Sequence, residues 1–288
     1  MAQTPHTIGN PLSWAAQQLS AAGSHVSAAT RELGTDHAHT PRRVRTMAMS
    51  DISDSLRAGW EDFKACRSDV LFIVLIYPVM GLLLMGMAFH QALLPLLFPM
   101  AAGFAIIGPM AAIGLYEMSR KREMGLEATW RDAFAVLGSP AFGAMLVMGL
   151  YLVALFCAWM LTAHFIHLVT MGPATQQSMG AFLSEVFNTT GGWWMIVLGC
   201  GVGFVFALVA LAVSVVSFQL LLHRHVGAPV AVMTSVHVLQ KNPKVVLCWG
   251  AVIAVMLVLG SLPLLLGLMV VLPLLGHASW HFYRRAVA

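Results

Sequence analysis

The sequence predicts an all-α membrane protein, a polytopic helix bundle with six transmembrane helices and both termini on the inner side (N-in/C-in). Three observations lead to this prediction: the composition, the lengths of the apolar segments and the positions of the basic residues. Hydrophobic residues make up 59% of the 288 residues and charged residues only 10%, whereas a soluble domain has about 25% charged residues. With so few charges the chain could not cover a water-exposed surface, so it belongs in a membrane.

Six apolar segments follow a polar N-terminal stretch. Residues 1–49 are rich in Ala, Ser, Thr, Gln and His and are predicted to be a flexible cytoplasmic tail. Residues 50–288 are predicted to form the integral membrane domain. Its spans are expected near residues 70–89, 92–116, 141–163, 194–222, 245–260 and 263–283.

The last two of these spans come from one run, residues 245–276, that contains no charge. A single helix over this run would be about 48 Å long, whereas the hydrocarbon core is about 30 Å thick. Gly260, Ser261 and Pro263 lie in the middle of the run, and Gly, Ser and Pro break helices. The run is therefore predicted to form a tight hairpin.

The basic residues set the orientation of the bundle. With six spans and the N-terminus inside, all 16 Lys and Arg residues fall in the inner segments 1–69, 117–140, 223–244 and 284–288. This is the distribution that the positive-inside rule describes. With five spans, Arg284 and Arg285 would lie outside. The net charge of +4 is therefore explained by topology, and nucleic acid is not an expected partner.

A short amphipathic stretch precedes each pair of spans on the inner side. The three stretches are residues 50–69, 127–140 and 229–243; in the first, Ile52, Leu56, Trp60 and Phe63 form an apolar stripe. Such a helix lies at the headgroup level with its apolar face buried; the alternative is that it docks on a partner. The sequence thus predicts three repeats of an interfacial helix followed by a helical hairpin.

Three stretches resemble a known bacterial family. They are PRRVRTMAMSDISDSLRAGWEDFKACRSDVLFIVLIYPVMGLLL (41–84), GPMAAIGLYEMSRKREMG (108–125) and LPLLGHASWHFYRR (272–285). Together they resemble the predicted integral membrane proteins called domain of unknown function 2189, over residues 41 to the end. The resemblance implies a multi-pass protein of the bacterial inner membrane. It implies no activity and no catalytic or binding residues.

Two histidines, His277 and His281, lie four residues apart near the end of the last span, which places them on one helix face. Trp280, Arg284 and Arg285 surround them, and an aromatic and basic cluster is what a helix needs at the membrane interface. No metal site and no other cofactor is predicted. If a metal or haem were bound here, His223 and His225 would be the other candidate ligands.

Further side chains are assigned to the interface and to its inner surface. The predicted membrane-interface anchors are Trp60, Trp130, Trp193, Trp194, Trp280, Arg284 and Arg285. Glu117 ends the second span and can pair with Arg120 and Lys121 at i+3 and i+4. With Arg122 these residues form a neutralised, lipid-facing helix end; the alternative is a cytoplasmic contact for a partner.

Small residues repeat every four positions in the fourth span, at Gly199, Gly203 and Ala207. Small residues on one face let helices approach closely in a membrane. We therefore predict a packing face here, either within the chain or between two copies of it.

The function predicted from these features is non-enzymatic. No catalytic motif is found, and the span interiors contain no Asp, Glu, Lys or Arg, whereas coupled transporters place ionisable groups there. We expect an interaction, assembly or accessory factor whose partners are the lipid bilayer and either another membrane protein complex or a second copy. The alternative is a transporter or binder of an apolar small molecule or lipid, with a continuous cavity lined by Tyr77 and Tyr151.

Overall fold

The structure is a computed structural model that describes residues 43–66, 86, 95–173, 178–224, 226–262 and 265–288. This part of the chain is helical and contains no β-sheet; its single isolated β-bridge joins Val44 to Val287. The helices are α2 (Ser50–Ala65), α5 (Leu97–Ala111), α6 (Ile113–Glu123), α7 (Trp130–Ala135), η2 (Val136–Gly138), α8 (Phe142–Met171), α9 (Met179–Asn188), α10 (Thr190–Ser214), α11 (Ser217–Arg224), α12 (Ala228–Lys241), α13 (Pro243–Ser261) and α14 (Leu268–Ala286).

Four helical stretches in the described residues are long and apolar enough to cross a membrane. They are Leu97–Glu123, Phe142–Met171, Thr190–Arg224 and Pro243–Ser261, and they correspond to the second, third, fourth and fifth predicted spans. The first predicted span, residues 70–89, lies almost wholly outside the described residues. The sixth corresponds to α14, whose second half carries His277, His281, Arg284 and Arg285.

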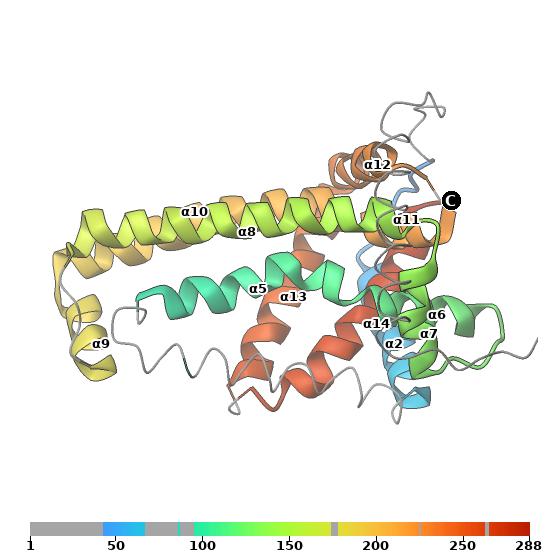
Figure 1. The fold of residues 1–288 in the computed structure, drawn as a ribbon, viewed down its shortest axis with the longest axis horizontal. Helices are drawn as coiled ribbons and strands as arrows, with labels where there is room; N and C mark the ends of the chain where they lie inside the picture. The colour runs from blue at the N-terminus through green and yellow to red at the C-terminus, as the bar shows by residue number, and fades with distance from the viewer. Residues whose placement is uncertain (1–42, 67–85, 87–94, 174–177, 225, 263–264) are drawn as a thin grey trace, which may run out of the picture.

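The uncharged run at residues 245–276 forms two helices, as predicted. Helix α13 ends at Ser261 and α14 begins at Leu268, and Figure 1 shows the two as a V with its apex below α5. Leu265 adopts a positive φ of 66° in the connection. A Cβ atom on Gly267 would come within 2.7 Å of the Gly260 carbonyl oxygen, so the turn depends on glycine at that position.

Two helices differ in extent from the predicted spans. The third span continues to Met171, eight residues beyond its predicted end, because His164 and His167 lower the hydrophobicity without interrupting the helix; Gly172, at φ 81°, ends it. At 1.5 Å per residue α8 is about 45 Å long, so in a membrane it is tilted or projects from the core. The second span is broken at Ala112, between α5 and α6, three residues after Pro109, which lacks an amide donor.

Helix α9 was not predicted. It lies between α8 and α10 at the far end of the bundle (Figure 1), in a segment that sequence reasoning treated as an outer loop. Its N-terminus is capped by Ser178, whose hydroxyl accepts from the Ala181 amide, and its buried side chains are Phe182 and Val186. Amphipathicity at helical spacing was the available signal.

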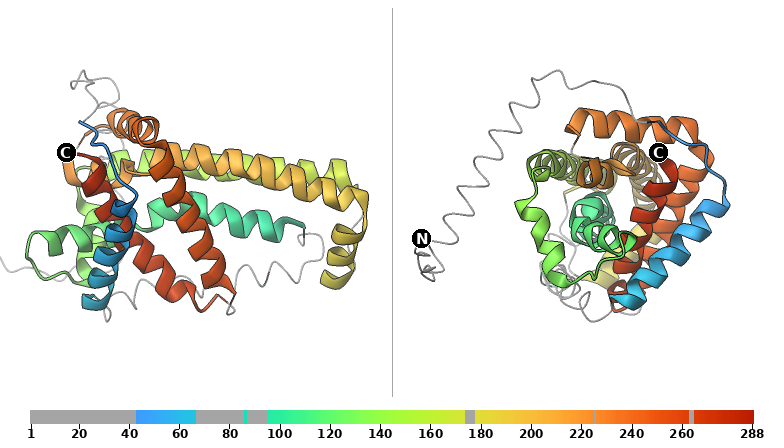
Figure 2. Two further views of the ribbon diagram at one scale, coloured as in Figure 1. Left: turned by 180° about the vertical axis from the view of Figure 1, so that it is seen from behind. Right: turned by 90° about the vertical axis from the view of Figure 1, so that its right-hand side faces the viewer.

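The three predicted interfacial stretches are helical and surround one end of the bundle. They contain α2, α7 and α12, and the end-on view in Figure 2 shows these helices around the ends of the longer helices. Helix α2 packs on α14, α7 on α6 and α12 on α11. We call this arrangement of α2, α7 and α12 the collar.

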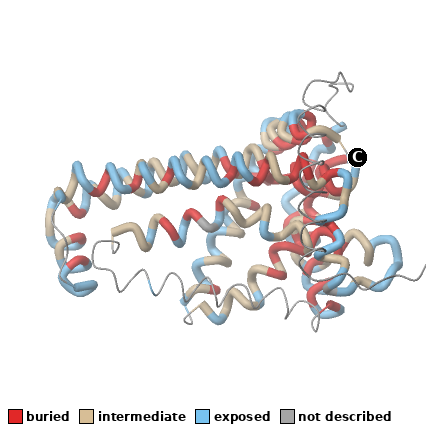
Figure 3. Tube along the Cα trace, in the orientation of Figure 1, coloured by how far each residue is buried: buried red, intermediate tan, exposed pale blue. Residues whose placement is uncertain are grey.

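The most buried side chains lie at the collar end (Figure 3). Trp249 and Phe282 stack there with ring centroids 4.9 Å apart, and Phe218 and Tyr283 are also fully enclosed. Away from this end, α8 and α10 expose large apolar side chains such as Phe165. Apolar groups on the outside and polar contacts at one end are what a membrane bundle requires.

The N-terminal and C-terminal ends of the described chain lie side by side. Besides the Val44–Val287 bridge, the Arg45 amide donates to the Ala286 carbonyl (2.9 Å) and the Ala288 amide donates to the Arg43 carbonyl (3.1 Å). Residues 43–49, which sequence reasoning included in the tail, are therefore joined to the membrane domain. Residues 1–42 lie outside the described residues.

Candidate functional site

A group of polar side-chain contacts, some buried and some half-exposed, joins α2, α6 and α14 at the collar end. We call it the polar cluster. Its members are Asp62, Ser119, Arg122, Glu123, His277, Trp280, His281 and Arg284. Amphipathic α2 brings the first of these residues, the end of α6 brings the next three, and one face of α14 brings the rest.

Asp62 is the centre of the cluster. Its carboxylate is 6% exposed and accepts from Arg122 Nε at 2.8 Å on one oxygen, while His281 Nε2 lies 2.8 Å from the other. Burial alone would raise the pKa of Asp62, but hydrogen bonds from His281, Arg122 and Ser119 outweigh burial and lower the pKa to about 2. One carboxylate thus links three helices that are far apart in sequence.

Ser119 and His277 form a second contact beside Asp62. Ser119 Oγ lies 2.8 Å from His277 Nδ1, and both residues are 0% exposed. His277 Nε2 has no hydrogen-bond partner among the described residues. A serine nucleophile acts with a histidine whose other nitrogen contacts a carboxylate; here the carboxylate of Asp62 contacts His281 instead, so these residues do not form a catalytic triad.

Glu123 connects the end of α6 to α14. One of its oxygens accepts from the indole nitrogen of Trp280 (2.9 Å) and the other from Arg284 Nε (2.8 Å). Trp280 is fully buried. Its ring therefore lies inside the protein and not among lipid headgroups, which differs from its predicted place as an interface anchor. Arg285, the residue after Arg284, pairs with α2: its Nη1 lies 3.3 Å from Oδ1 of Asp51.

The end of α6 forms three ion pairs within the chain. Glu117 is buried and accepts two hydrogen bonds from Arg120, at 2.7 and 2.6 Å, as the i+3 spacing predicted. Lys121 reaches Asp132 of α7 at 2.6 Å, and Arg122 reaches Asp62. These charges, considered above for a cytoplasmic contact, are engaged within the chain.

Three of the four histidines considered as metal ligands have separate partners in the described structure. His277 contacts Ser119, His281 contacts Asp62, and His223 Nδ1 lies 2.9 Å from the Tyr283 hydroxyl. His225 lies outside the described residues. Within those residues no group of three or more His, Cys, Asp and Glu side chains is placed to hold a metal ion.

The remaining predicted sites are distributed over the surface. Trp60 is 42% exposed, and Trp193 and Trp194 are 55% and 57% exposed, as an interface anchor requires. Trp130 begins α7, but its side chain lies outside the described part of the structure. The packing face is only partly used: a Cβ on Gly203 would be 2.9 Å from the Trp159 ring of α8, whereas nothing lies within 4 Å of one on Gly199, and Ala207 is exposed.

Comparison with known families agrees with this membrane architecture. Residues 97–223 match the predicted integral membrane protein family DUF2189. The DUF2189 region runs from the start of α5 to the end of α11, so it includes Ser119, Arg122 and Glu123 of the polar cluster and leaves out α2 and α14. No curated protein and no solved structure matches the chain.

Sequence reasoning missed the role of several cluster residues. Asp62, Ser119 and Glu123 are polar residues in or beside amphipathic segments, where solvent or lipid headgroups were the expected environment. The available signal was that Asp62 lies directly before Phe63 of the apolar stripe on α2. Its partners could not be identified, because they are 60 and 219 residues away in sequence.

Proposed function

We propose that this DUF2189 protein is a six-span, N-in/C-in protein of the bacterial inner membrane, with three repeats of an interfacial helix followed by a hairpin. We further propose that it acts without catalysis, as an interaction, assembly or accessory factor, and that the collar presents its contact surface to a membrane protein complex or a second copy.

The repeat is supported by one contact that recurs in each unit. Each predicted unit begins with a collar helix and closes with α6, α11 or α14. In all three cases a small residue of a collar helix contacts a small residue of the closing helix of the preceding unit. The collar helix of the first unit, α2, contacts the closing helix of the third, α14. The pairs are Gly59 with Ala278, Ala133 with Gly114, and Ala231 with Ser217. Such a cyclic pattern is what three copies of one unit around a central axis would produce.

The register of the three closing helices supports the same interpretation. The sixth and seventh residues after the small residue are basic or histidine in each copy. They are Arg120 and Lys121, His223 and Arg224, and Arg284 and Arg285. Each closing helix therefore carries at least one Lys or Arg at these equivalent positions, in agreement with the positive-inside rule.

The observation that carries the proposed function is the internal pairing of the polar cluster. Asp62, Glu117 and Glu123 are each bonded to arginine in the same chain, and Ser119 and His277 are fully buried. A reaction centre needs a group that a substrate can reach, and these groups hold helices together. A collar fixed by ion pairs between its helices and the longer helices suits a scaffold, whose surface must keep one shape.

For the alternative, a carrier or binder of apolar molecules, the tyrosines give no support. Tyr77 lies outside the described residues, and Tyr151 on α8 is 44% exposed.

Purification of a C-terminally tagged full-length protein from native membranes, with mass spectrometry of what accompanies it, tests the proposal. We expect membrane proteins at a fixed ratio to the tagged chain. The same proteins should be lost with Gly59→Leu, which prevents α2 from docking on α14, and kept with Gly199→Leu, whose position is open. Recovery of the tagged protein as a monomer, with a retained lipid or small molecule and no protein partner, would contradict the accessory role and favour the alternative.

A further inference from the structure

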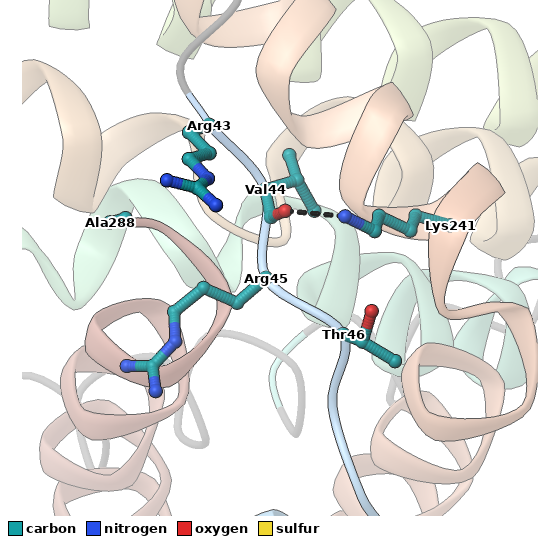
Figure 4. A pocket seen from close by; sticks show the side chains of 6 residues that line it. All are labelled: Arg43, Val44, Arg45, Thr46, Lys241 and Ala288. Atoms are coloured by element: carbon teal, nitrogen blue, oxygen red, sulfur yellow. Dashed lines mark hydrogen bonds between the residues drawn. The ribbon is translucent and has the colours of Figure 1, made fainter.

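The segment just before α2 presents two arginines on one side of an extended chain. Val44 and Met47 are buried, whereas Arg43 and Arg45 are exposed. Side chains two residues apart on an extended segment point to the same side, and Figure 4 shows both guanidinium groups on the side of the segment that faces Ala288. The exposed arginines are thus neighbours.

The backbone that carries these arginines is held on both edges. On one edge it pairs with Ala286 and Ala288, as described above. On the other edge Lys241 Nζ donates to the Val44 carbonyl at 2.7 Å, and the Asn242 amide group donates to the Arg45 carbonyl at 3.0 Å. The side-chain oxygen of Asn242, Oδ1, accepts from the Met47 backbone amide at 2.8 Å. The segment is therefore fixed before any ligand arrives.

An open pocket of about 450 Å³ lies along this segment. It is lined by Arg43, Val44, Arg45, Thr46, Lys241 and Ala288 (Figure 4). Three of these side chains carry a positive charge and the Thr46 hydroxyl is a further donor. No Asp or Glu side chain lines the pocket, and the one negative group there is the α-carboxylate of Ala288. The pocket is large enough for a phosphate group and part of what it is attached to.

The basic residues of the pocket differ from those of the polar cluster and its surroundings. Arg120, Arg122, Arg284 and Arg285 each pair with an Asp or Glu carboxylate. In the described structure no Asp or Glu carboxylate lies within ion-pair distance of Arg43, Arg45 or Lys241. The fold thus pairs the arginines of α6 and α14 with carboxylates and leaves three basic side chains in the pocket, against the single α-carboxylate of Ala288.

We propose that this pocket binds the phosphate group of an anionic ligand, with Arg43 and Arg45 as its donors. Guanidinium groups suit phosphate because their planar N–H groups can donate in pairs to two oxygens. Lys241 keeps the segment in place through the Val44 carbonyl and adds positive charge, and Thr46 offers a hydroxyl. The pocket is a binding site separate from the polar cluster, and the proposal does not depend on the accessory role.

Two sources could supply the phosphate. The pocket lies at the collar end, which by the distribution of basic residues faces the inner leaflet, so an anionic lipid headgroup is one source. A soluble phosphate or phosphomonoester is the other. Both make the same contacts with the arginines, and they differ in whether a bilayer is needed.

Lipid retention by the purified full-length protein tests the first source. The protein is placed in nanodiscs of phosphatidylcholine containing a minor fraction of phosphatidylglycerol, and the retained lipids are counted by native mass spectrometry after release. Arg43→Gln with Arg45→Gln should lower retention of phosphatidylglycerol about thirtyfold. Arg43→Lys with Arg45→Lys should keep part of it. Arg57→Gln with Lys64→Gln, which removes two exposed charges from α2, is the control and should behave as the wild type.

Thermal unfolding in detergent with inorganic phosphate, against chloride at equal ionic strength, tests the second source. A phosphate-dependent rise in the unfolding temperature that Arg43→Gln with Arg45→Gln abolishes, without a change in lipid retention, would assign a soluble ligand. The proposal is wrong if both readouts are the same for the wild type and this variant. It is also wrong if the Arg57 and Lys64 control variant loses as much phosphatidylglycerol as the Arg43 and Arg45 variant, because binding would then follow net charge alone.

Discussion

Gly59 of α2 lies so close to Ala278 of α14 that a Cβ atom at position 59 would be 2.6 Å from the Ala278 amide nitrogen. The two helices meet here without an intervening side chain, and this approach brings Asp62 within reach of Arg122 and His281. A backbone contact of this kind cannot be relieved by turning a side chain. The polar cluster therefore depends on glycine at position 59.

Gly59→Ala is expected to destabilise the protein by about 1–3 kcal/mol, because the added methyl group must push α2 away from α14. The measurement is the midpoint of thermal unfolding of the purified full-length protein in mild detergent. In an uncrowded helix the same change stabilises by about 0.5–1 kcal/mol, so the two effects have opposite signs.

Gly199→Ala is the matched control for that substitution. No described residue lies within 4 Å of a Cβ atom at this position of α10, so the midpoint should stay the same or rise. A fall would show that Gly199 packs against a second copy or against a segment outside the described residues. An unchanged midpoint for Gly59→Ala would contradict the close packing of α2 on α14.

The Asp62 carboxylate is expected to make stability fall at acidic pH. Its pKa is lowered to about 2 in the folded protein and is close to 4 in an unfolded chain. A lowered pKa stabilises the fold above the unfolded value, and that contribution, about 2 kcal/mol, is lost as pH falls from about 4 to about 2. Unfolding midpoints measured from pH 6 down to pH 3 should therefore fall.

Asp62→Asn should remove this part of the pH dependence and lower the midpoint at pH 6. Asp54→Asn is its control: Asp54 is an exposed α2 carboxylate 3.4 Å from Arg285, and an exposed pair contributes little. Equal acid sensitivity of the wild type and Asp62→Asn would mean that other groups cause the loss.

Trp280→Phe is expected to cost about 0.5–1.5 kcal/mol, because it removes the hydrogen bond from the buried indole nitrogen to the half-exposed Glu123 carboxylate. Trp194→Phe on the exposed face of α10 should change the midpoint little. Fluorescence supplies a second readout: the emission of a fully buried indole should be protected from a water-soluble quencher. Quenching of Trp280 in a variant that retains only this tryptophan would contradict its burial.

The fold was predicted more fully than the site because a membrane constrains length and hydrophobicity strongly. The break between α13 and α14 followed from a run too long for one span, and the collar helices followed from apolar residues at helical spacing. The end of α8 was misjudged because hydropathy reports the bilayer boundary, whereas the helix ends only where Gly172 changes the backbone.

The site could not be predicted because its partners are brought together by packing between distant segments. The i+3 pair of Glu117 and Arg120 was predictable, since both lie on one helix. The contacts of Asp62 with Arg122 and His281 were not, because they require α2 to lie on α14. Trp280 was assigned to the interface for the same reason: the sequence shows an aromatic residue near a helix end but not the α6 residues that cover it.

Cysteine labelling tests the N-in/C-in orientation that the positive-inside distribution predicts. In a chain without native cysteines, Ser53→Cys on α2 and Met233→Cys on α12 should react with a membrane-impermeant maleimide only after the cells are opened, because both exposed positions lie on the collar. Ser184→Cys on α9, at the opposite end, should react in intact cells. Leu150→Cys, which is 59% exposed on α8 but lies within a span, should stay unlabelled in both states. Labelling of positions 53, 184 and 233 all from one side would contradict a bundle that crosses the membrane between the collar and α9.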